Sequence, residues 1–230
     1  PDLGFFPVEV GYGRWERTGA AITSADIASL KEADAILFGA VTTPPDPGYR
    51  SVVVRMRKEL DLYANVRPVR GEDADIVIIR ENTEGDHSGA GGFVTLGSPD
   101  ACSLQTSVFT RKGCERVIRY AFELARKRKK FGDKAPVGMV TNCTKSNALN
   151  YSMVFWDLVY NNVAAEYPDV KTDYAHVDAT TMWMVKNPEW FDVIVTPNMF
   201  GDIITDLGAM IQGGMGVAAG GNINPQGVSM

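Results

Sequence analysis

Three arginines in the first part of the chain have the spacing expected of a site for a small acid. Arg57 and Arg67 flank the segment 59–66, and Arg80 ends the apolar run 76–79. An arginine at the end of a buried strand lies where the sheets of α/β proteins place ligand contacts. Because guanidinium groups bind carboxylates through two parallel hydrogen bonds, converging arginines predict a site for a dianionic acid. Each arginine taken alone is more often a surface or structural residue.

Two aspartates near the end of the chain are spaced as metal ligands. Asp202 and Asp206 are four residues apart in a segment with a helical pattern, which puts both carboxylates on one face of the helix. Hard cations such as Mg²⁺ and Mn²⁺ take oxygen ligands, so this pair is a candidate metal site. The alternative is that Asp202 only favours a helix N-terminus and that Asp206 is solvated.

A lysine and a further aspartate follow apolar segments directly. Lys145 comes after a strand-like run, and Asp178 ends a short apolar segment. A lysine that loses solvent can have its pKa lowered into the range of a general base. Taken singly, both are more often half-exposed residues at strand ends.

The elements that must position these residues follow an α/β pattern, because short apolar runs alternate with helical periodicity. Thr23 and Asp26 predict a helix start. The predicted strands are 35–39, 76–79, 137–140 and 193–195, and the predicted helical faces lie within 117–125, 154–163 and 200–211. Neither the glycine fingerprint of a Rossmann site nor a P-loop is present, so a Rossmann fold is not supported.

The composition is that of a folded globular protein. Of its 230 residues 45% are hydrophobic, and the net charge is −5, which argues against nucleic acid as a partner. An odd count of three cysteines without close spacing favours reduced thiols. There is no apolar stretch long enough for a bilayer and no signal-peptide pattern, so we expect a cytoplasmic protein without a membrane partner. The chain opens at Pro1 and stops after a glycine-rich segment, and we expect it to be part of one continuous, longer subunit.

Four motifs taken together resemble the isocitrate/isopropylmalate dehydrogenase family of β-decarboxylating dehydrogenases. They are Leu60-Asp61-Leu62-Tyr63-Ala64-Asn65-Val66-Arg67-Pro68, Arg80-Glu81-Asn82-Thr83-Glu84-Gly85, Thr144-Lys145-Ser146-Asn147 and the segment 198–206. They stand in the family's order, and the resemblance runs from about Val8 to the last residue. It implies a two-lobed α/β/α fold with a large mixed sheet. Residues 1–70 with 196–230 would form the cofactor side, and 71–195 the substrate and dimerisation side.

The resemblance also implies the reaction, which is metal-dependent oxidative decarboxylation of a 3-substituted (R)-malate with NAD or NADP. Arg57, Arg67 and Arg80 would bind the malate carboxylates, and Asn147 would lie near the nicotinamide. Lys145 of a second subunit would help to deprotonate the C2 hydroxyl.

The implied metal site is shared between subunits in the same way. Asp202 and Asp206, with Asp178 supplied by the second subunit, would hold Mg²⁺ or Mn²⁺. The resemblance therefore implies a homodimer whose active sites are built from both chains.

The chain departs from the family pattern at the residue that protonates the product. The family usually has tyrosine where this chain has His87. Because histidine exchanges protons near neutral pH, we expect His87 to replace the tyrosine as the acid. The alternative is that this step is impaired or mediated by water. The family's opening glycine-rich loop and its adenosine-binding loop are expected outside residues 1–230, which leaves NADP open beside the default NAD.

Substrate choice is expected to depend on the stretch before the first arginine. Val53 and Val54 suit an alkyl group, which favours 3-isopropylmalate and a role in leucine biosynthesis. Arg50 and Arg55 could instead meet the third carboxylate of homoisocitrate or isocitrate, and the motifs also resemble tartrate and D-malate dehydrogenases. An alternative to an enzyme is a non-catalytic regulatory or ligand-sensing subunit, and the histidine at position 87 keeps this alternative open.

Overall fold

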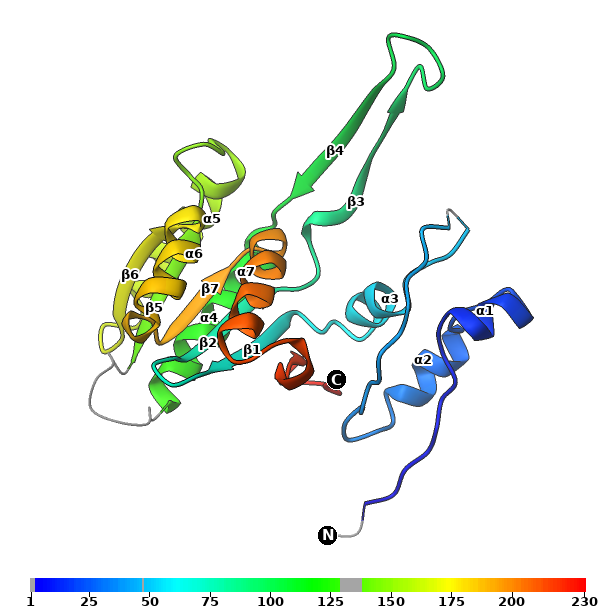
Figure 1. Ribbon diagram of the computed structural model, residues 1–230, viewed down its shortest axis with the longest axis horizontal. Coiled ribbons are helices and arrows are strands. Elements are labelled where there is room, and N and C mark those ends of the chain that lie inside the picture. Colours follow the sequence, from blue (N-terminus) through cyan, green and yellow to red (C-terminus); the bar gives the residue numbers. More distant parts are fainter. Residues whose placement is uncertain (1–2, 47, 129–137) are drawn as a thin grey trace. The chain divides into compact units, whose positions relative to one another are not determined.

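The computed structural model describes residues 3–46, 48–128 and 138–230. The chain forms two compact units (Figure 1). Unit 1 contains Pro1–Leu62 and Asn222–Met230, and unit 2 contains Tyr63–Gly221. The division falls within the short strand β8 (Gly221–Ile223): Gly221 belongs to unit 2, and the rest of the strand belongs to unit 1.

Unit 2 is built on a mixed sheet in which five strands run in the order β6-β5-β7-β2-β1. Their bounds are β1 (Ala64–Arg70), β2 (Asp75–Glu81), β5 (Met139–Thr144), β6 (Lys171–His176) and β7 (Val193–Thr196). Only β1 is antiparallel to its neighbour β2, while β2, β7, β5 and β6 pair in parallel. The predicted large mixed sheet is confirmed.

A separate two-stranded sheet extends from this unit in Figure 1. It is the hairpin of β3 (Gly85–Val94) and β4 (Cys102–Val108), whose strands pair antiparallel. All of β4 is exposed, so packing within unit 2 buries almost none of the hairpin. The hairpin begins four residues after β2 ends, and its base therefore lies next to the edge of the main sheet.

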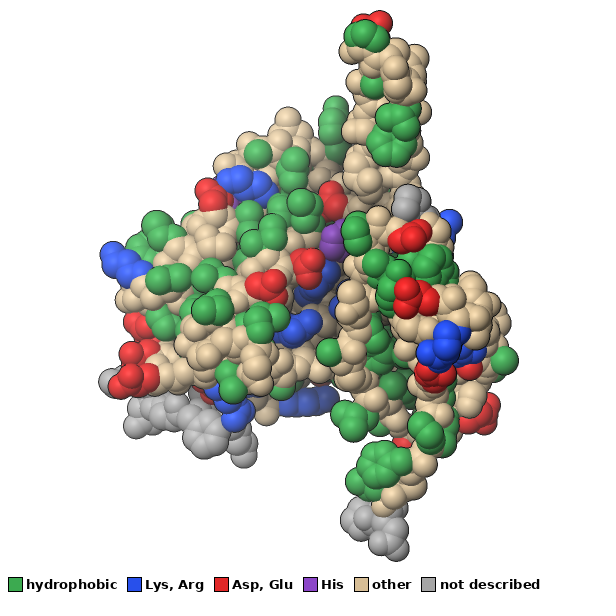
Figure 2. Space-filling view, turned by 45° about the vertical axis from the view of Figure 1, so that its right-hand side comes forward, with side chains coloured by type: hydrophobic (Ala, Val, Ile, Leu, Met, Phe, Trp, Pro, Cys, Tyr) green, Lys and Arg blue, Asp and Glu red, His purple; other side chains and the backbone are tan. Residues whose placement is uncertain are grey.

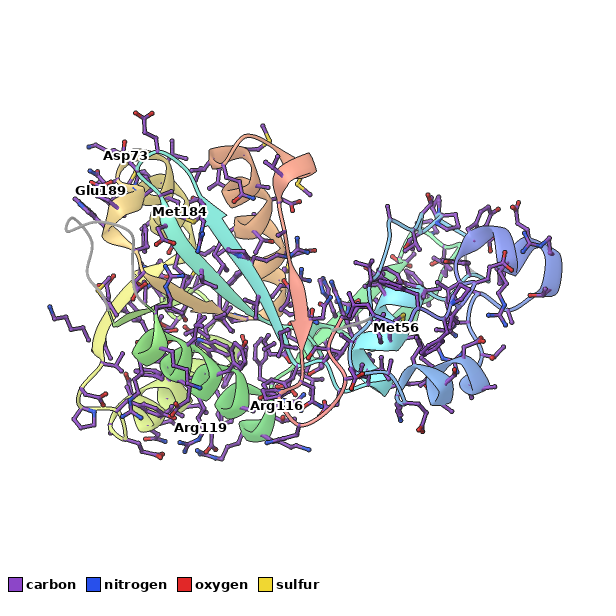
Figure 3. All side chains as sticks on the ribbon, turned by 90° about the horizontal axis from the view of Figure 1, so that it is seen from below. Met56, Asp73, Arg116, Arg119, Met184 and Glu189 are labelled. Atoms are coloured by element: carbon purple, nitrogen blue, oxygen red, sulfur yellow. The ribbon has the colours of Figure 1, made fainter. Side chains whose placement is uncertain are left out.

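The helices of unit 2 lie on both faces of the sheet and are α4 (Arg111–Lys127), α5 (Ser152–Ala164), α6 (Val177–Lys186) and α7 (Asn198–Ile211), with the 3-10 turns η1 (Pro188–Trp190) and η2 (Met215–Val217). Successive side chains of a strand point to opposite faces. Ile76 and Ile78 of β2 join one apolar cluster with Met184 of α6, labelled in Figure 3, and Ile204 of α7. The whole of β2 from Ile76 onward is buried, because helices cover its second face as well. The predicted α/β/α layering is thus confirmed in this unit.

The helices also expose a number of large apolar side chains. Figure 2 shows green side chains over much of the helical surface of unit 2. Those on α5 and α6 are Val154, Leu158, Met182 and Val185.

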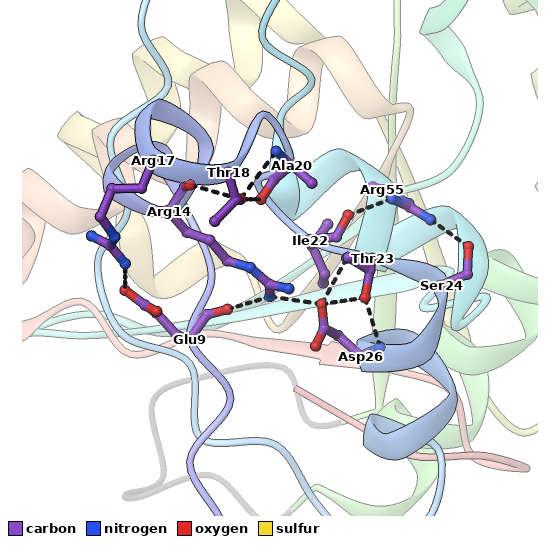
Figure 4. Close-up of polar contacts among 10 residues, drawn as sticks. All are labelled: Glu9, Arg14, Arg17, Thr18, Ala20, Ile22, Thr23, Ser24, Asp26 and Arg55. Carbon is purple, nitrogen blue, oxygen red and sulfur yellow. Dashed lines mark hydrogen bonds and ion pairs between the residues drawn. The ribbon is translucent and has the colours of Figure 1, made fainter.

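Unit 1 holds three helices, α1 (Tyr12–Thr18), α2 (Ser24–Leu30) and α3 (Val52–Glu59), around a core that includes Met56. Figure 4 shows the start of α2, where Thr23 and Asp26 form a capping box. The backbone N–H of Asp26 donates to Thr23 Oγ1 at 3.2 Å, and the backbone N–H of Thr23 donates to Asp26 Oδ2 at 2.7 Å. The helix start predicted there is confirmed.

The buried strand predicted at 35–39 is wrong. Ala35 forms a single bridge with Ser229, and Leu37 is 89% exposed. A strand needs a neighbour that satisfies its backbone groups, and within the described residues this run obtains only the bond from Ile36 N–H to Ser229. Apolar composition alone therefore overestimated its burial.

The other predicted elements are confirmed, with small shifts of their ends. The strand expected at 137–140 is β5, which begins at Met139, and residue 137 lies outside the described residues. The compact units differ from the expected lobes, because residues 63–70 and 196–221 belong to unit 2. The reason is hydrogen bonding and packing, since β1 pairs with β2 along its full length and α7 covers both strands. No helix in the described residues is long and apolar enough to cross a membrane.

Candidate functional site

The parallel strands of unit 2 end along one edge of the sheet, and most of the predicted site residues lie there. Arg80 of β2 is paired in register with Thr196 of β7, and Thr144 of β5 with His176 of β6. The carboxyl edge of a parallel sheet is the usual place for ligands in α/β proteins. Lys145 directly follows β5, Asp178 lies in the first turn of α6 after β6, and α7 begins just after β7.

Arg67 and Arg80 lie on the same face of the sheet. Asn65 of β1 is directly opposite Arg80 of β2 in the antiparallel register, and Arg67 is two residues further along β1. Residues two apart on a strand share a face, so the two arginines are diagonal neighbours. The Nε–H of Arg67 donates to Asn65 Oδ1 at 3.0 Å, which orients its guanidinium along this face. The predicted proximity of these two arginines is present in the fold.

Arg80 is buried, with only 2% of the residue exposed. Its Nε and Nη2 both donate to Asn198 Oδ1, at 3.0 and 2.7 Å, and its Nη1 forms an ion pair with Asp202. Burial lowers the pKa of Arg80, and the neighbouring Asp202 carboxylate acts in the opposite direction. A guanidinium carries five N–H groups, so two are left beyond the three that Asn198 and Asp202 engage.

Helix α7 is held close to this face by two glycines. A Cβ on Gly201 would lie 2.4 Å from Cγ of Arg80, and one on Gly208 would lie 2.5 Å from Cγ2 of Val69. The absence of side chains at these two positions, seven residues apart, lets the helix lie directly on β1 and β2. As a result the Asp202 side chain reaches Arg80 while remaining 57% exposed.

The two aspartates of α7 fit a cation site in part. Asp206 is exposed, as Asp202 is, and the two are one turn apart on the helix. Asp202 lies beyond the first turn, where the attraction of the helix N-terminus has fallen off, so that attraction does not explain it. The described residues contain no group of three acidic, histidine or cysteine side chains placed to hold a metal. The pair therefore offers two carboxylates, without a third such side chain grouped with them in the described residues.

His87 lies at the start of β3 and contacts the same cluster. Its Nδ1 is 3.1 Å from Asn198 Oδ1, while Asn198 Nδ2 donates to the carbonyl of Glu84 at 2.9 Å. Gly85 has a φ of 76°, a conformation that favours glycine, and a Cβ there would be 3.4 Å from Asn198. The chain can therefore turn tightly around Asn198 and bring His87 beside it.

Asn198 is a site residue that the sequence analysis did not single out. It is 2% exposed and contacts both Arg80 and His87 through one oxygen atom. Its position as the first residue of α7, directly after β7, could have pointed to it, since this is where parallel sheets place polar groups.

Lys145 and Asp178 form a second cluster along the same edge. Lys145 Nζ donates to Asp178 Oδ1 at 2.6 Å, and this hydrogen bond from Lys145 lowers the pKa of Asp178. The loss of solvent expected for Lys145 is partial, because a quarter of its side chain is exposed. Asn147 lies exposed in the turn that follows. Asp178 is not gathered with Asp202 and Asp206 into one metal-holding group of the described chain.

The remaining predicted residues lie in unit 1, on α3. Arg57 and Val53 are half-buried, and Val54 is exposed. Arg55, a candidate for a third substrate carboxylate, has other partners, which Figure 4 shows in part: its Nη1 donates to the Ile22 carbonyl at 2.6 Å and its Nη2 to Ser24 at 3.0 Å. It also pairs with Glu59 one turn later on the helix. Its donors thus join α2 to α3.

Comparison with known proteins identifies relatives over almost the whole chain. The model of the isocitrate/isopropylmalate dehydrogenase family matches residues 2–230. A 3-isopropylmalate dehydrogenase of Thermobifida fusca is 45% identical over 95% of this chain and 64% of its own length. One of Rhodococcus opacus is 42% identical over 100% of this chain and 70% of its own length. The chain thus spans about two thirds of the length of these relatives.

Solved structures agree with the fold. An isocitrate dehydrogenase of Methylococcus capsulatus is 38% identical, with a TM-score of 0.85 over 96% of this chain and 66% of that chain. A β-decarboxylating dehydrogenase of Thermococcus kodakarensis is 36% identical, with a TM-score of 0.76 over 96% of this chain and 62% of that chain. The names of these relatives give different substrates or none, but all of them describe dehydrogenases.

Proposed function

Because the chain belongs to the isocitrate/isopropylmalate dehydrogenase family, we propose that the protein carries out metal-dependent oxidative decarboxylation of a 3-substituted (R)-malate with NAD. Members of this family are NAD(P)-dependent dehydrogenases acting on a CH–OH group. The first substrate that we propose is 3-isopropylmalate, the substrate in the names of the relatives at 42–45% identity.

The observation that carries the proposal is the cluster around Arg80. A buried guanidinium keeps two N–H groups for a ligand next to the exposed carboxylate of Asp202. Paired N–H groups match a substrate carboxylate, and an adjacent carboxylate can bind the cation that the same acid would chelate. Arg67 on the same sheet face supplies a second guanidinium. Arg57 on α3 is proposed as a third.

Asp202 and Asp206 would hold Mg²⁺ or Mn²⁺, completed by Asp178 of a second copy of this chain. A cation held there would supply electrophilic stabilisation of the oxygen on C2, and a bound nicotinamide would supply the acceptor for the hydride of C2. Asn147 would lie beside the nicotinamide. This donor set of carboxylate oxygens suits a hard cation.

The chain's own residues would move the protons. Lys145 of the second copy, in its neutral amine form once Asp178 binds the cation instead of the ammonium, would take the proton of the C2 hydroxyl. After CO₂ leaves, His87 would give a proton to C3 of the resulting enolate. These are the two positions at which a proton must be removed and added.

We propose a homodimer with shared sites for two reasons. The acids of α7 and the Lys145–Asp178 pair are separate clusters within one described chain, so a second copy is needed to bring them together. Helices α5 and α6 also expose a set of apolar side chains that a second copy would cover (Figure 2).

The partners of Arg55 favour an alkyl group over a third carboxylate on the substrate. Its donors are engaged by a backbone carbonyl, a serine and Glu59, so recruiting it to a substrate would break contacts within unit 1. Val53 and Val54 on the same helix offer apolar surface instead. Of the arginines near this stretch, Arg50 remains exposed and keeps homoisocitrate and isocitrate in the test.

The test is initial rates of nicotinamide reduction with 3-isopropylmalate, D-malate, tartrate, homoisocitrate and isocitrate, each with NAD or NADP and Mn²⁺. We expect the highest kcat/KM with 3-isopropylmalate and NAD. A preference for a tricarboxylate would contradict the role given to Val53 and Val54.

His87 favours one second candidate, a non-catalytic subunit that senses a malate. It stands where the family usually has tyrosine, and a subunit without the proton donor could still bind ligand. Binding of Mn²⁺ and a malate without reduction of either nicotinamide would support this function against the enzyme.

A further inference from the structure

We propose that Asn198 is a positioning residue that fixes the imidazole of His87 with its proton on Nδ1, so that Nε2 is the atom that exchanges protons with the substrate. The use of this proton rests on the proposed function. The tautomer itself follows from contacts within unit 2 and holds whether or not the protein is an enzyme.

The orientation of the Asn198 amide follows from its partners. Its Oδ1 faces Nε and Nη2 of Arg80, and a guanidinium offers only donors. Its Nδ2 faces the carbonyl oxygen of Glu84, which offers only an acceptor. A flipped amide would place donors against donors and an acceptor against an acceptor, so this orientation is the one that satisfies both sides.

The protonation of Nδ1 then follows. Asn198 Oδ1 can only accept, and it lies 3.1 Å from Nδ1 of His87. This contact favours donation from Nδ1, in the neutral as well as in the charged form, because an unprotonated Nδ1 would set its lone pair against those of Oδ1. Oδ1 then accepts from this N–H group and from two N–H groups of Arg80. Within the described residues Nε2 makes no hydrogen bond, and the side chain is exposed.

In the proposed reaction this arrangement defines the proton transfer. The Nε2–H bond of the charged ring breaks, and the electron pair of the C2–C3 double bond of the enolate forms the new C3–H bond. The oxygen on C2 becomes a carbonyl, and the ring becomes neutral with its Nδ1 proton still donated to Asn198. The same asparagine oxygen holds Arg80, so the acid and the carboxylate-binding group share one anchor.

The test uses the two histidines of the chain, His87 and His176. The complete protein is labelled with ¹⁵N at Nδ1 of histidine only, and solid-state NMR spectra are recorded at a pH at which imidazole is neutral. The His176→Gln variant assigns the two signals. We expect the His87 signal at the shift of a protonated ring nitrogen. A His87 signal at the shift of an unprotonated nitrogen would overturn the proposal without any change at Asn198.

Two substitutions separate positioning from general structure. Asn198→Leu removes the acceptor, and we expect the His87 signal to move toward the unprotonated shift. Asn198→Asp restores an acceptor and should restore the protonated shift. Gln105→Ala is the matched control, because Gln105 donates to the carbonyl of Asp86, next to His87, without contacting the ring. An Asn198→Leu signal identical to the wild-type signal would contradict the proposal.

Activity supplies a second readout that distinguishes this inference from the proposed function. During turnover in D₂O the wild-type protein should place deuterium on one face of C3, and Asn198→Leu should lose this stereospecificity together with ~10- to 100-fold of kcat/KM. Turnover by Asn198→Leu with full stereospecificity would contradict the positioning role. A protonated Nδ1 in a protein that turns over no malate would keep the positioning role and reject the enzyme.

Discussion

Arg80 is a buried charge whose environment explains why it is retained. An ionised group without partners is costly to bury, and here Asn198 and Asp202 compensate three of its N–H groups. The planar fork of a guanidinium can serve these partners and a ligand at the same time. An ammonium group at the end of a lysine has neither the reach nor the geometry to do so.

We therefore predict that Arg80→Lys lowers kcat/KM for the malate by about 100-fold, since it removes one or two charge-assisted hydrogen bonds. Most of the loss should be in KM, as measured by initial rates. Arg119→Lys on α4 is the control, because Arg119 pairs with the surface acids Glu115 and Glu166 and should change kcat/KM little. Equal effects of the two substitutions would remove Arg80 from the substrate site.

The sequence predicted the charged residues of the site, but it did not predict the residue that holds them in place. Arg80, Asp202 and Lys145 stand in motifs of recognisable spacing, and the structure brings the first two into contact. Asn198 belongs to one of the same motifs, yet its role depends on a hydrogen bond to a residue 111 positions earlier in the chain. Spacing along the sequence carries no information about such a contact.

Helix α7 shows how an element positions the site. Gly201 and Gly208 remove the side chains that would separate the helix from β1 and β2, and Asp202 thereby reaches Arg80. Glycine inside a helix is unfavourable by about 1 kcal/mol relative to alanine, so close packing must offset that cost here.

Gly201→Ala should accordingly destabilise the protein by ~1–3 kcal/mol, because the added methyl group overlaps the side chain of Arg80. Its effect is measured by urea unfolding. Gly13→Ala in α1 is the matched control, since its nearest atom would be 3.9 Å away, and it should be neutral or stabilising. A stabilised Gly201→Ala protein would show that α7 does not depend on this approach.

The capping box of α2 gives a prediction with a pH dependence. Hydrogen bonding from Thr23 and the nearby Arg14 lowers the pKa of Asp26 below its ordinary value of 3.8. A lowered pKa in the folded state means that the carboxylate stabilises the fold above that ordinary value, and that this contribution is lost as the pH falls through the folded pKa. Asp26→Asn should therefore destabilise unit 1 at pH ~7 and less at pH ~3.

Thr23→Ala should cost about 1 kcal/mol at neutral pH, as is usual for loss of an N-cap. Urea unfolding of both variants at the two pH values measures these effects. A destabilisation by Asp26→Asn that did not shrink at low pH would contradict the charged capping box.

Elements were predicted well where the pattern was local. The apolar faces of α4, α5 and α7 repeat at helical spacing, and Thr23 with Asp26 marks a helix start directly. The run 35–39 has an equally apolar sequence, but strand formation depends on a neighbour that no local pattern contains. The same reason explains why the lobe boundaries at 70 and 196 differ from the compact units.

The whole molecule is proposed to act as a dimer, because the two clusters along the sheet edge are separate in one described chain. Subunit mixing tests this directly. Lys145→Ala and Asp202→Asn proteins should each be inactive, whereas a heterodimer would contain one site with both intact residues.

Random exchange of subunits makes half of the dimers mixed, so we predict recovery of about a quarter of the wild-type activity after unfolding and refolding the two variants together. Each variant refolded alone is the control. No recovery from a mixture that contains heterodimers would place Lys145 and Asp202 in the same subunit's site.

The most direct test of the central claim follows NADH and CO₂ in one reaction with 3-isopropylmalate. The account predicts equal amounts of both products in the presence of Mn²⁺, and neither product after the cation is removed with EDTA. NADH formed without CO₂, or turnover unaffected by EDTA, would contradict metal-dependent oxidative decarboxylation.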